Sequence, residues 1–505
     1  MSEIDVVVVG AGPTGLLLAA ELALGGCRVR IVERRASAQR HSRALTLHPR
    51  SLEILEQRGI AQRFLAAGST SSRWHYARLD TELDFAALHS RHPYTLLLAQ
   101  ARTEALLAER VRELGVPIER GVEFTGFAQD DRAVEVEVRS DGSRETFRCG
   151  YLVGCDGARS VVRQAAGIGF PGTEETVTGM LGDFVVADQT GVAAAREAGV
   201  LVVPLSAEVA RFVIMDPQRI RVPSSEPVTE DEFRESLQRL CGTDRAIGDP
   251  RWLSRFGNAT RIADHYRRGR VLLAGDAAHI HFPAAGQGLN TGLQDAMNLG
   301  WKLSAEVAGR APVGLLDTYE AERRPVARAV ATDTEVQTFL AELLMMPEYQ
   351  RPATALRALL DDLLGIESVN HRLAGRISGL DIRYPGDQGE DPLVGGRMPD
   401  IAVVDAGDPP VRISELLHEG RFVLLCHADP RLGDELDGAI RVFIASGYDD
   451  CDDLNGVTEI LIRPDGHIAW ASRQTDPVAL RTDRARALNT WVGTGPVLAA
   501  TDKDA

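Results

Sequence analysis

The sequence predicts an α/β protein in three parts: a mostly parallel sheet covered by helices, a mixed β-sheet inserted into it, and a C-terminal sheet-containing domain. Three observations predict this arrangement. A β-branched run at residues 4–9 leads through a glycine-rich turn into an Ala- and Leu-rich segment. Residues 172–263 contain short strand-like runs separated by turn residues. The Gly-, Pro- and Asp-rich residues 384–400 then separate this part from later apolar runs.

The first elements follow from local sequence. Residues 4–9 predict a strand buried on both faces, because the run is continuously apolar. Residues 14–24 are rich in Leu, Ala and Glu and end at two glycines, which predicts a helix. Residues 28–33 predict a second parallel strand, so the chain starts with a β-α-β unit.

Later elements are predicted by the same criteria. Further helices are expected at residues 50–59, 104–114 and 291–307, and then with breaks as far as 364. Further strands are expected at residues 133–138, at 149–160 running into a turn, and at 200–204, 211–215, 270–274, 421–426, 441–445 and within 459–470.

Bulk properties restrict the class of protein. A length of 505 residues exceeds what one core normally supports, so two or three domains are expected. A net charge of −16 makes nucleic acids and anionic membranes unlikely partners. The six cysteines are scattered, without a C-x-x-C pair or metal-ligand spacing, so we expect no metal site. With no signal-peptide pattern, a cytoplasmic protein with reduced thiols is expected.

The first turn has the spacing of a dinucleotide-binding turn. Gly10, Gly12 and Gly15 stand between the first strand and the first helix, where they permit a tight turn, close approach of a pyrophosphate and close helix packing. Glu33 ends the second strand, where its carboxylate can bind an adenosine ribose. The neighbouring residues that we include as candidate contacts are Pro13, Thr14 and Arg34.

Two further motifs favour FAD over NAD. The first is the run Cys-Asp-Gly-Ala-Arg-Ser at residues 155–160. The second is Gly-Asp-Ala-Ala-His at residues 275–279, followed by Pro283 and by Gly-Gln-Gly-Leu-Asn at residues 286–290. An Asp at a strand end can bind a polyol hydroxyl, and a glycine-rich turn can bring backbone N–H groups to a flat heterocycle that carries carbonyls. FAD has both of these features and NAD has neither.

In this order and spacing, the three motifs resemble those of the class A flavoprotein aromatic hydroxylases, the para-hydroxybenzoate hydroxylase family. That resemblance runs from residue 4 to about 330. Residues 256–261, 279–303 and 462–470 resemble more narrowly the bacterial aromatic-polyketide hydroxylases of angucycline or anthracycline type. The narrower group implies a thioredoxin-like C-terminal domain, which here lacks a C-x-x-C pair. The fold expected is therefore a Rossmann-like FAD-binding domain with an inserted mixed sheet and a thioredoxin-like domain.

The resemblance also implies domain boundaries and residue roles. The FAD-binding domain would span residues 1–171 and 264–330, the substrate domain 172–263 with 331–390, and the thioredoxin-like domain 395–500. By resemblance, Arg43 and Gln100 contact the pyrophosphate and ribityl region, and Asp156 with Arg159 supports FAD and nicotinamide binding. The remaining implied contacts, along the flavin chain and ring, are Asp276, Pro283, Gly286, Gly288, Leu289 and Asn290.

The implied reaction is aromatic hydroxylation through a C4a-hydroperoxyflavin, with O2 as oxidant and NADPH, or alternatively NADH, as transient reductant. The flavin carries the chemistry, so no catalytic side chain is assigned, although Pro283 would lie beside the ring. The sequence has no second G-x-G-x-x-G for the nicotinamide nucleotide, and the resemblance implies a flavin that swings outward to meet it. The substrate expected is a polycyclic phenol of polyketide type, in antibiotic biosynthesis.

Several alternatives stay open. Aromatic residues that could stack on a fused-ring substrate, together with one Met, are Trp74, Tyr76, Phe184, Phe212 and Met215, although ordinary core packing is the leading interpretation of each. The same scaffold could catalyse a Baeyer–Villiger oxidation, inactivate an antibiotic by hydroxylation, or hold flavin and ligand without catalysis. The sequence does not distinguish a monomer from a homodimer.

Overall fold

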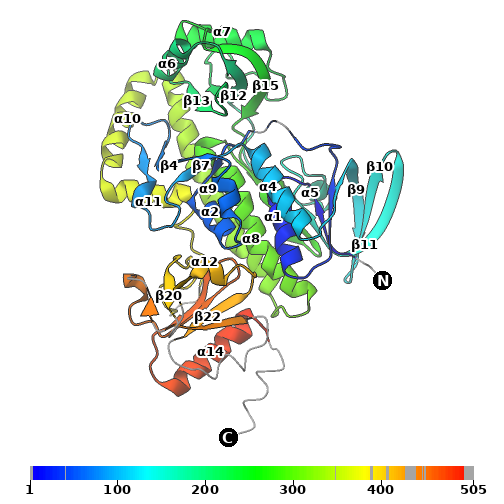
Figure 1. Cartoon of the computed structure of the whole chain (residues 1–505). Coiled ribbons are helices and arrows are strands. Elements are labelled where there is room, and N and C mark those ends of the chain that lie inside the picture. Colours follow the sequence, from blue (N-terminus) through cyan, green and yellow to red (C-terminus); the bar gives the residue numbers. More distant parts are fainter. Residues whose placement is uncertain are drawn as a thin grey trace.

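The chain forms three bodies along one long axis (Figure 1). This computed structural model describes residues 4–39, 41, 43–346, 348–386, 390–404, 409–426, 440–445, 447–448 and 451–493. The largest sheet and its helices lie in the middle, a smaller green sheet lies at one end, and the orange and red C-terminal sheet lies at the other (Figure 1). The mixed α/β architecture predicted from sequence is confirmed.

The central sheet is parallel where the cofactor turn was predicted. Its strand order is β17-β18-β11-β1-β2-β8, and β1 (Ile4–Val9) pairs in parallel with β2 (Val29–Glu33) and with β11 (Ser143–Gly154). The strands β8 (Ile118–Arg120) and β18 (Val271–Leu273) extend the parallel set. The first half of β11 forms an antiparallel meander with β10 (Val134–Ser140) and β9 (Val122–Gln129). The predicted β-α-β unit and the alternating strand are thus confirmed.

Long helices cover this sheet. The helix α1 (Pro13–Leu24) packs against α8 (Gln287–Val307) and α4 (Gln100–Glu113), and its residues 15–22 are all buried. The helix predicted at residues 291–307 begins four residues earlier, because Gly286 adopts a left-handed conformation at its N-cap (φ 75°). Shorter elements are α2 (Pro49–Glu56), α3 (Ala61–Leu65), α5 (Val161–Ala165), β3 (Thr46–Leu47), β4 (Ser69–Ser71), β7 (Thr95–Leu97), β16 (Arg261–Ile262), β17 (Arg267–Arg268) and β19 (His279–Ile280).

The smaller sheet is antiparallel and its chain segment lies between β11 and β18 of the central sheet. Its order is β13 (Leu201–Pro204), β14 (Val209–Ile214), β12 (Thr178–Val186) and β15 (Ile247–Gly257). The helices α6 (Gln189–Glu197) and α7 (Glu230–Cys241) cover one face of this sheet and share its apolar core. These two helices leave the opposite face of the sheet uncovered.

Part of the helices after residue 318 shares a small core with residues 76–88. The helix α9 (Thr318–Met345) is followed by α10 (Gln350–Leu364) and α11 (Glu367–Ser378). Their buried residues form one cluster with residues 76–88, around β5 (Arg73–Trp74), β6 (Leu83–Asp84) and a 3-10 turn (Phe85–Ala87). Directly after β15, Asn258 donates a side-chain hydrogen bond to Glu342 on α9 (3.1 Å).

The C-terminal part contains the predicted strands. The sheet order is β23 (Ile440–Ile444), β22 (Phe422–Cys426), β25 (Glu459–Ile462) and β26 (Ile468–Ser472), with β22 and β23 parallel and the other pairs antiparallel. The helix α14 (Pro477–Trp491) packs on this sheet, and α12 (Ile413–Leu416), β20 (Ala402–Val404), β21 (Val411–Arg412) and β24 (Gly447–Tyr448) complete this part. The end of the expected domain, residues 494–500, lies outside the described residues.

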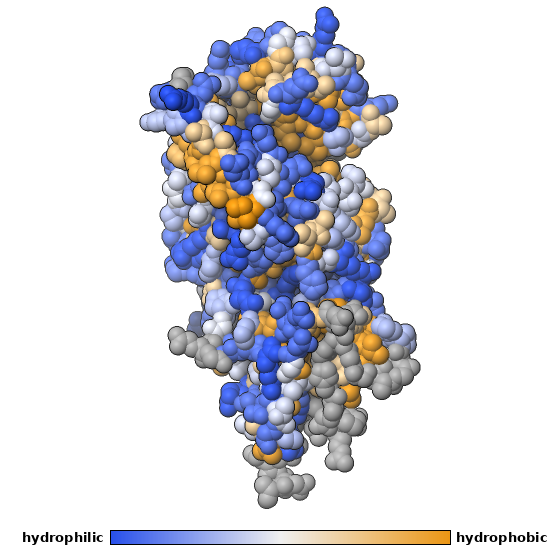
Figure 2. Space-filling model, turned by 90° about the vertical axis from the view of Figure 1, so that its left-hand side faces the viewer, coloured by the Kyte–Doolittle hydropathy of each residue, from blue (hydrophilic) through white to orange (hydrophobic). Residues whose placement is uncertain are grey.

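Part of the surface on the side of α10 is apolar. Figure 2 shows apolar side chains gathered on the upper half of this side of the molecule. The exposed residues there include Phe339 on α9 and Leu356, Leu359 and Leu363 on α10. Among the described residues, no helix combines the length and apolarity needed to cross a membrane.

Candidate functional site

A cavity of about 830 Å³ lies where the central sheet, the smaller sheet and α9 meet. Its wall includes the carboxyl ends of β1 and β2, the residues before and at the start of α8, and one face of the smaller sheet. The predicted cofactor contacts that line it are Gly10, Gly12, Pro13, Thr14, Glu33, Arg34, Arg43, Gln100, Asp156, Arg159, Asp276, Pro283, Gly286, Gly288 and Leu289. The structure therefore brings together three motifs that are far apart in sequence.

The first glycine turn is built by steric limits. Gly10 has φ 105°, and a Cβ there would lie 2.4 Å from the carbonyl oxygen of Cys155. A Cβ on Gly15 would lie 2.1 Å from the carbonyl oxygen of Gly10, so glycine is needed for the close packing at this position behind the cavity wall. A Cβ on Gly12 would meet nothing within 4 Å, because Gly12 faces open space. The turn thus has two crowded positions and one open one.

The open position lies at the start of α1. No side chain caps this helix and its first turn has no acidic residue, so its first N–H groups are available to an anion. Glu33 braces the turn from the neighbouring strand, because its carboxylate accepts hydrogen bonds from the N–H of Ala11 (2.9 Å) and of Arg35 (2.9 Å). Glu33 therefore has a structural role in addition to the ribose contact that was predicted.

The second motif is linked to the third. Asp156 accepts hydrogen bonds through Oδ2 from the N–H of Val161 (2.7 Å) and of Val162 (3.2 Å), while its Oδ1 is buried and has no partner. Arg163 donates to the carbonyl oxygens of Ala158 (3.0 Å) and Ala277 (2.8 Å). The two motifs are therefore held at a fixed separation by one guanidinium.

A buried ionic cluster supports the third motif. Asp295, fully buried on α8, accepts hydrogen bonds from the N–H of Gly275 (3.1 Å), from His279 (2.6 Å) and from Arg323 (2.7 Å). His279 is therefore a structural residue, and its ring faces a carboxylate rather than the cavity. Asp276 is exposed to the open cavity, and the surrounding protein raises the pKa of its carboxyl by limiting its hydration.

The loop before α8 is held by side chains from β3 and its neighbours. Ala285 has φ 51°, and its carbonyl oxygen contacts His48 Nε2 (2.8 Å) and accepts a hydrogen bond from Trp74 Nε1 (3.1 Å). Asn290 donates to the carbonyl oxygens of Thr46 (3.1 Å) and Gly286 (2.8 Å), and its Oδ1 accepts from the N–H of His48 (2.8 Å). Asn290 thus lies behind the cavity wall and supports it.

Two predicted contacts already have protein partners. The Arg43 guanidinium donates to Ser254 Oγ (3.1 Å) and to the carbonyl oxygen of Arg255 (2.9 Å), so it connects the segment between β2 and β3 to the smaller sheet. Gln100 donates to Glu104 (2.8 Å) within α4. Both side chains still line the cavity, and neither contact uses all of their donors.

The residues proposed for substrate stacking divide into two groups. Trp74 and Met215 line the cavity. Phe184 and Phe212 are fully buried in the core of the smaller sheet, where Phe184 packs on Phe233 with ring centroids 4.9 Å apart. Tyr76 is buried among the residues that pack on α9 to α11. None of these three lines the cavity, so the expectation that they contact a ligand is corrected: tertiary packing turns them away from it.

Sequence patterns assigned no ligand contact to several polar residues at the wall. His75, Arg211, His281 and Gln337 all line the cavity. Burial lowers the pKa of His75 and of His281 to about 4, so both rings are neutral near pH 7. Arg211 forms a buried ion pair with Asp183 (2.6 Å). The closest available signal was the sequence pattern of β14, in which the charged Arg211 stands between the apolar Ala210 and Phe212.

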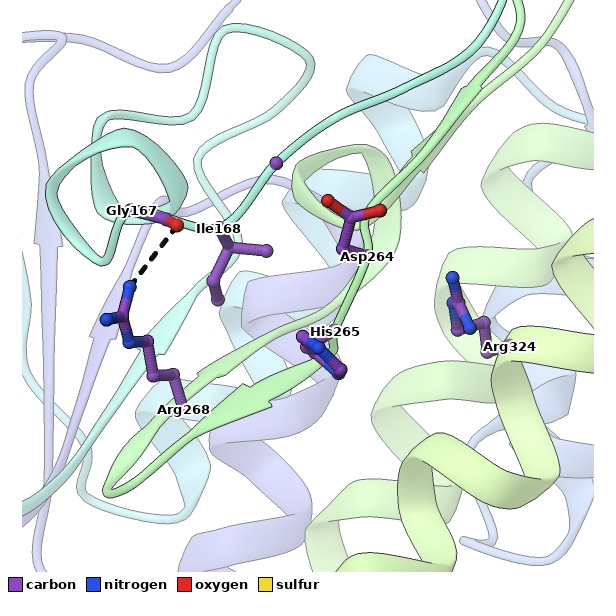
Figure 3. Close-up of a pocket in the computed structure, with 7 residues that line it drawn as sticks. Gly167, Ile168, Asp264, His265, Arg268 and Arg324 are labelled. Atoms are coloured by element: carbon purple, nitrogen blue, oxygen red, sulfur yellow. Dashed lines mark hydrogen bonds between the residues drawn. The ribbon is translucent and has the colours of Figure 1, made fainter.

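A second cavity of about 630 Å³ lies outside this site (Figure 3). Arg268 donates to the carbonyl oxygen of Gly167 (3.2 Å), and Arg324 donates to that of Ala263 (3.0 Å). His265 is paired with Glu320 (3.2 Å). Its cationic side chains are thus already engaged by protein groups, and in the described part of the chain no cluster of three or more His, Cys, Asp or Glu residues could hold a metal ion.

Comparison with known proteins decides the family. Residues 3–334 match the family described as FAD binding domain, and residues 391–495 match the family described as aromatic-ring hydroxylase, C-terminal. The chain belongs to the FAD-dependent aromatic hydroxylases. The resemblance stated from the motifs is confirmed, and the protein is an enzyme of the monooxygenase class.

Relatives and solved structures match nearly the whole chain. The aromatic compound monooxygenase YhjG of Bacillus subtilis is 46% identical over 94% of this chain and 96% of its own. The structure of the anhydrotetracycline hydroxylase OxyS from Streptomyces rimosus matches with TM-score 0.88 and 40% identity, covering 97% and 99%. That of CabE, an aromatic hydroxylase from angucycline biosynthesis, matches with TM-score 0.86 and 36% identity, covering 98% and 100%. Dialkyldecalin synthase of Streptomyces rugosporus is 35% identical, covering 97% and 98%.

Proposed function

We propose that this family member hydroxylates a polycyclic phenol of aromatic-polyketide type, with O2 as oxidant and NADPH as reductant, in antibiotic biosynthesis. The observation that carries the proposal is the single cavity wall shared by the three motifs, the apolar face of the smaller sheet and α9. The cavity of about 830 Å³ is lined by the three motifs as well as by the smaller sheet, so the cofactor and the substrate would share it. The names of the relatives support a fused aromatic substrate.

The residues present fit FAD. The open space at Gly12 and the uncapped start of α1 would accept the pyrophosphate. Asp156 Oδ1 and Gln287 Nε2 are buried polar atoms at the same wall without protein partners, and a polyol chain and a ring carbonyl would satisfy them. Glu33 and Arg34 would bind the adenosine end, while Asp276 and Pro283 would lie along the flavin. When bound, FAD supplies the oxygen-activating chemistry.

The chain itself would position the substrate and exclude water. Leu181, Val213 and Met215 give an apolar wall at the smaller sheet, and Trp74, which donates to the carbonyl oxygen of Ala285, also lines the cavity. The phenol can supply its own activation as a phenolate, so no protein base is assigned. His281 stays neutral near pH 7, and its Nε2 has no partner in the structure. This nitrogen would accept a hydrogen bond from an N–H or O–H group of a ligand.

The C-terminal part supports a structural interpretation. We propose that residues 395–500 form a thioredoxin-like domain without redox activity. The strand order β23-β22-β25-β26, with one parallel pair, supports the first statement. Cys426 is buried, Cys451 is half-buried, and the sequence has no C-x-x-C pair, which supports the second. We also propose that residues 1–171 with 264–330 form the FAD-binding domain and that residues 172–263 with 331–390 form the substrate domain. A cytoplasmic location completes the proposal.

The test is isotope incorporation. The FAD-loaded protein, NADPH and anhydrotetracycline or 1,8-dihydroxyanthraquinone are incubated under ¹⁸O2, and products are analysed by mass spectrometry. We expect a product that carries one ¹⁸O atom, and NADPH oxidation that accelerates when phenol is added. Phe339→Ala, on the exposed face of α9, is a control variant. It should leave both the ¹⁸O incorporation and the phenol-dependent NADPH oxidation at the wild-type level. NADPH oxidation that yields only hydrogen peroxide with every phenol would contradict the proposal.

One relative favours a second candidate function. Because dialkyldecalin synthase matches along the whole chain, the same scaffold could close a ring in a substrate without inserting oxygen. The two functions differ in their need for a reductant. A product that forms without NADPH and has the mass of its substrate would favour cyclisation, whereas a ketone substrate converted to an ester with ¹⁸O would favour a Baeyer–Villiger reaction.

A further inference from the structure

Gln337 on α9 carries an unused hydrogen-bond donor at the cavity wall. Its side chain is 4% exposed, and its Oε1 accepts a hydrogen bond from the N–H of Ala77 (3.2 Å). Because a backbone N–H can only donate, this contact fixes the orientation of the carboxamide, with oxygen toward Ala77. Nε2 then points elsewhere, and it is buried without a hydrogen-bond partner. A buried donor is normally paired, so this one indicates a missing acceptor.

A strained turn lies directly beside this donor. Ala77 (φ 49°) and Arg78 (φ 56°) are consecutive non-glycine residues in the left-handed region, and both line the cavity. Arg357 on α10 holds the turn by donating to the carbonyl oxygens of Ala77 (2.9 Å) and Arg78. Backbone strain of this kind concentrates at ligand contacts and persists because surrounding groups impose it. Gln337 and the turn therefore form one polar wall.

Among the groups near this wall, one indole is already paired and three side chains are single methyl groups. Trp74 Nε1 already donates to the carbonyl oxygen of Ala285. Ala285, Ala77 and Ala341 line the same cavity with methyl side chains, which leave room for a flat ring. Of the four wall residues with an unpartnered buried polar atom, Gln337 is the one outside the sequence motifs and their flanking loop; the others are Asp156, His281 and Gln287.

We propose that Gln337 is a specificity-determining residue, whose Nε2 donates a hydrogen bond to a ketone or phenolic oxygen of the bound polycyclic substrate. This inference rests on the proposed function and names a contact within it. In this arrangement α9 recognises the polar edge of the substrate, and the smaller sheet contacts its apolar rings.

The experiment compares two substitutions with one control. Gln337→Glu preserves shape and the acceptor for Ala77 but replaces the donor with an oxygen, and Gln337→Met removes both polar groups. Val336→Thr changes the preceding residue, which is 45% exposed. The dissociation constants of anhydrotetracycline and 1,8-dihydroxyanthraquinone are measured on each FAD-loaded protein, together with FAD content, melting temperature, kcat and KM.

We expect both Gln337 variants to bind at least one probe about tenfold or more weakly and to raise KM more than they lower kcat. FAD content should stay constant in Gln337→Glu, and Val336→Thr should behave as the wild type. Unchanged dissociation constants in Gln337→Glu, with wild-type binding intact, would overturn this proposal alone. If the wild-type holoenzyme bound neither probe, the proposed function would fail and this inference with it.

Discussion

At the scale of single residues, Gly10 and Gly12 have different roles in the same turn, because only Gly10 is sterically crowded. A Cβ on Gly10 would collide with the carbonyl oxygen of Cys155 at 2.4 Å, and its φ of 105° disfavours any other residue. Gly10→Ala should therefore destabilise the apo protein by about 2 kcal/mol or more. Urea unfolding of the apo protein measures this difference. An unchanged midpoint and slope would show that the turn relaxes freely.

Gly12→Ala should give the opposite result. Its φ of −79° suits any residue, and a Cβ there meets nothing within 4 Å. The apo protein should keep its unfolding free energy within about 0.5 kcal/mol. FAD affinity should fall, because the methyl group occupies the open space where we place the pyrophosphate. Quenching of flavin fluorescence measures the affinity, and equal FAD binding by wild type and variant would remove the pyrophosphate from this position.

At the scale of elements, the loop before α8 depends on Asn290. Its carboxamide satisfies two carbonyl oxygens and one N–H of buried backbone. Asn290→Ala leaves these groups unpaired, so we expect a loss of about 3 kcal/mol in unfolding free energy. Thr354→Ala, on exposed α10, is the control and should cost less than about 1 kcal/mol. A loss in Asn290→Ala no larger than in the control would mean that the loop does not need this brace.

The same loop should make stability depend on pH through His48. Burial lowers the pKa of this fully buried imidazole to about 4, below its value of about 6.5 in an unfolded chain. Between these values the unfolded state binds the proton first, so stability is full above about pH 6.5 and falls by about 1.4 kcal/mol per pH unit as the pH drops toward 4. Urea unfolding at several pH values tests this. His48→Gln, which cannot titrate, should show a shallower decline, and an identical slope would contradict the assignment.

Sequence patterns predicted the motifs better than the pocket, for a physical reason. Turn geometry at Gly10, Asp156 and Asp276 is local, since it follows from glycine spacing and the order of strand and helix. The orientation of strand residues is not local, because a shift of one position exchanges the two faces of a sheet. On β12 and β14, Leu181 and Val213 are paired and line the cavity, whereas Phe184 and Phe212 lie on the opposite face in the core. Gln337 is recognisable only after folding, because its significance depends on Ala77.

At the scale of the whole molecule, a buried ionic network fixes the C-terminal part to the central body. Arg463, in the turn after β25, donates to both carboxylate oxygens of Glu322 on α9 (2.8 Å each) and to Asp465 (2.5 Å). Lys302 on α8 contacts the same Glu322 (2.7 Å) and is fully buried. Burial lowers the pKa of Lys302 to about 7; the charges of Arg463 and Lys302 overcome burial and lower that of Glu322 to about 2. Because Arg323 follows Glu322 and binds Asp295, the network continues to the third motif.

Removing one partner from this network should cost far more than removing a surface pair. Arg463→Met would leave two buried carboxylates, Glu322 and Asp465, facing one lysine, so we expect a loss of about 3–5 kcal/mol in unfolding free energy. Arg63→Met breaks a pair of similar length (2.8 Å) to Glu113, but those side chains are 32% and 44% exposed, and the loss should stay below about 1 kcal/mol. Chemical unfolding of the two variants gives both values. Glu322, the partner of Arg463, precedes Arg323, which binds Asp295, and Asp295 in turn accepts a hydrogen bond from the N–H of Gly275 in the third motif. Arg463→Met should therefore also weaken FAD binding, whereas Arg63→Met should not. Equal losses in the two variants would show that the buried network adds nothing beyond an exposed pair, and that the C-terminal domain is only tethered to the flavin site.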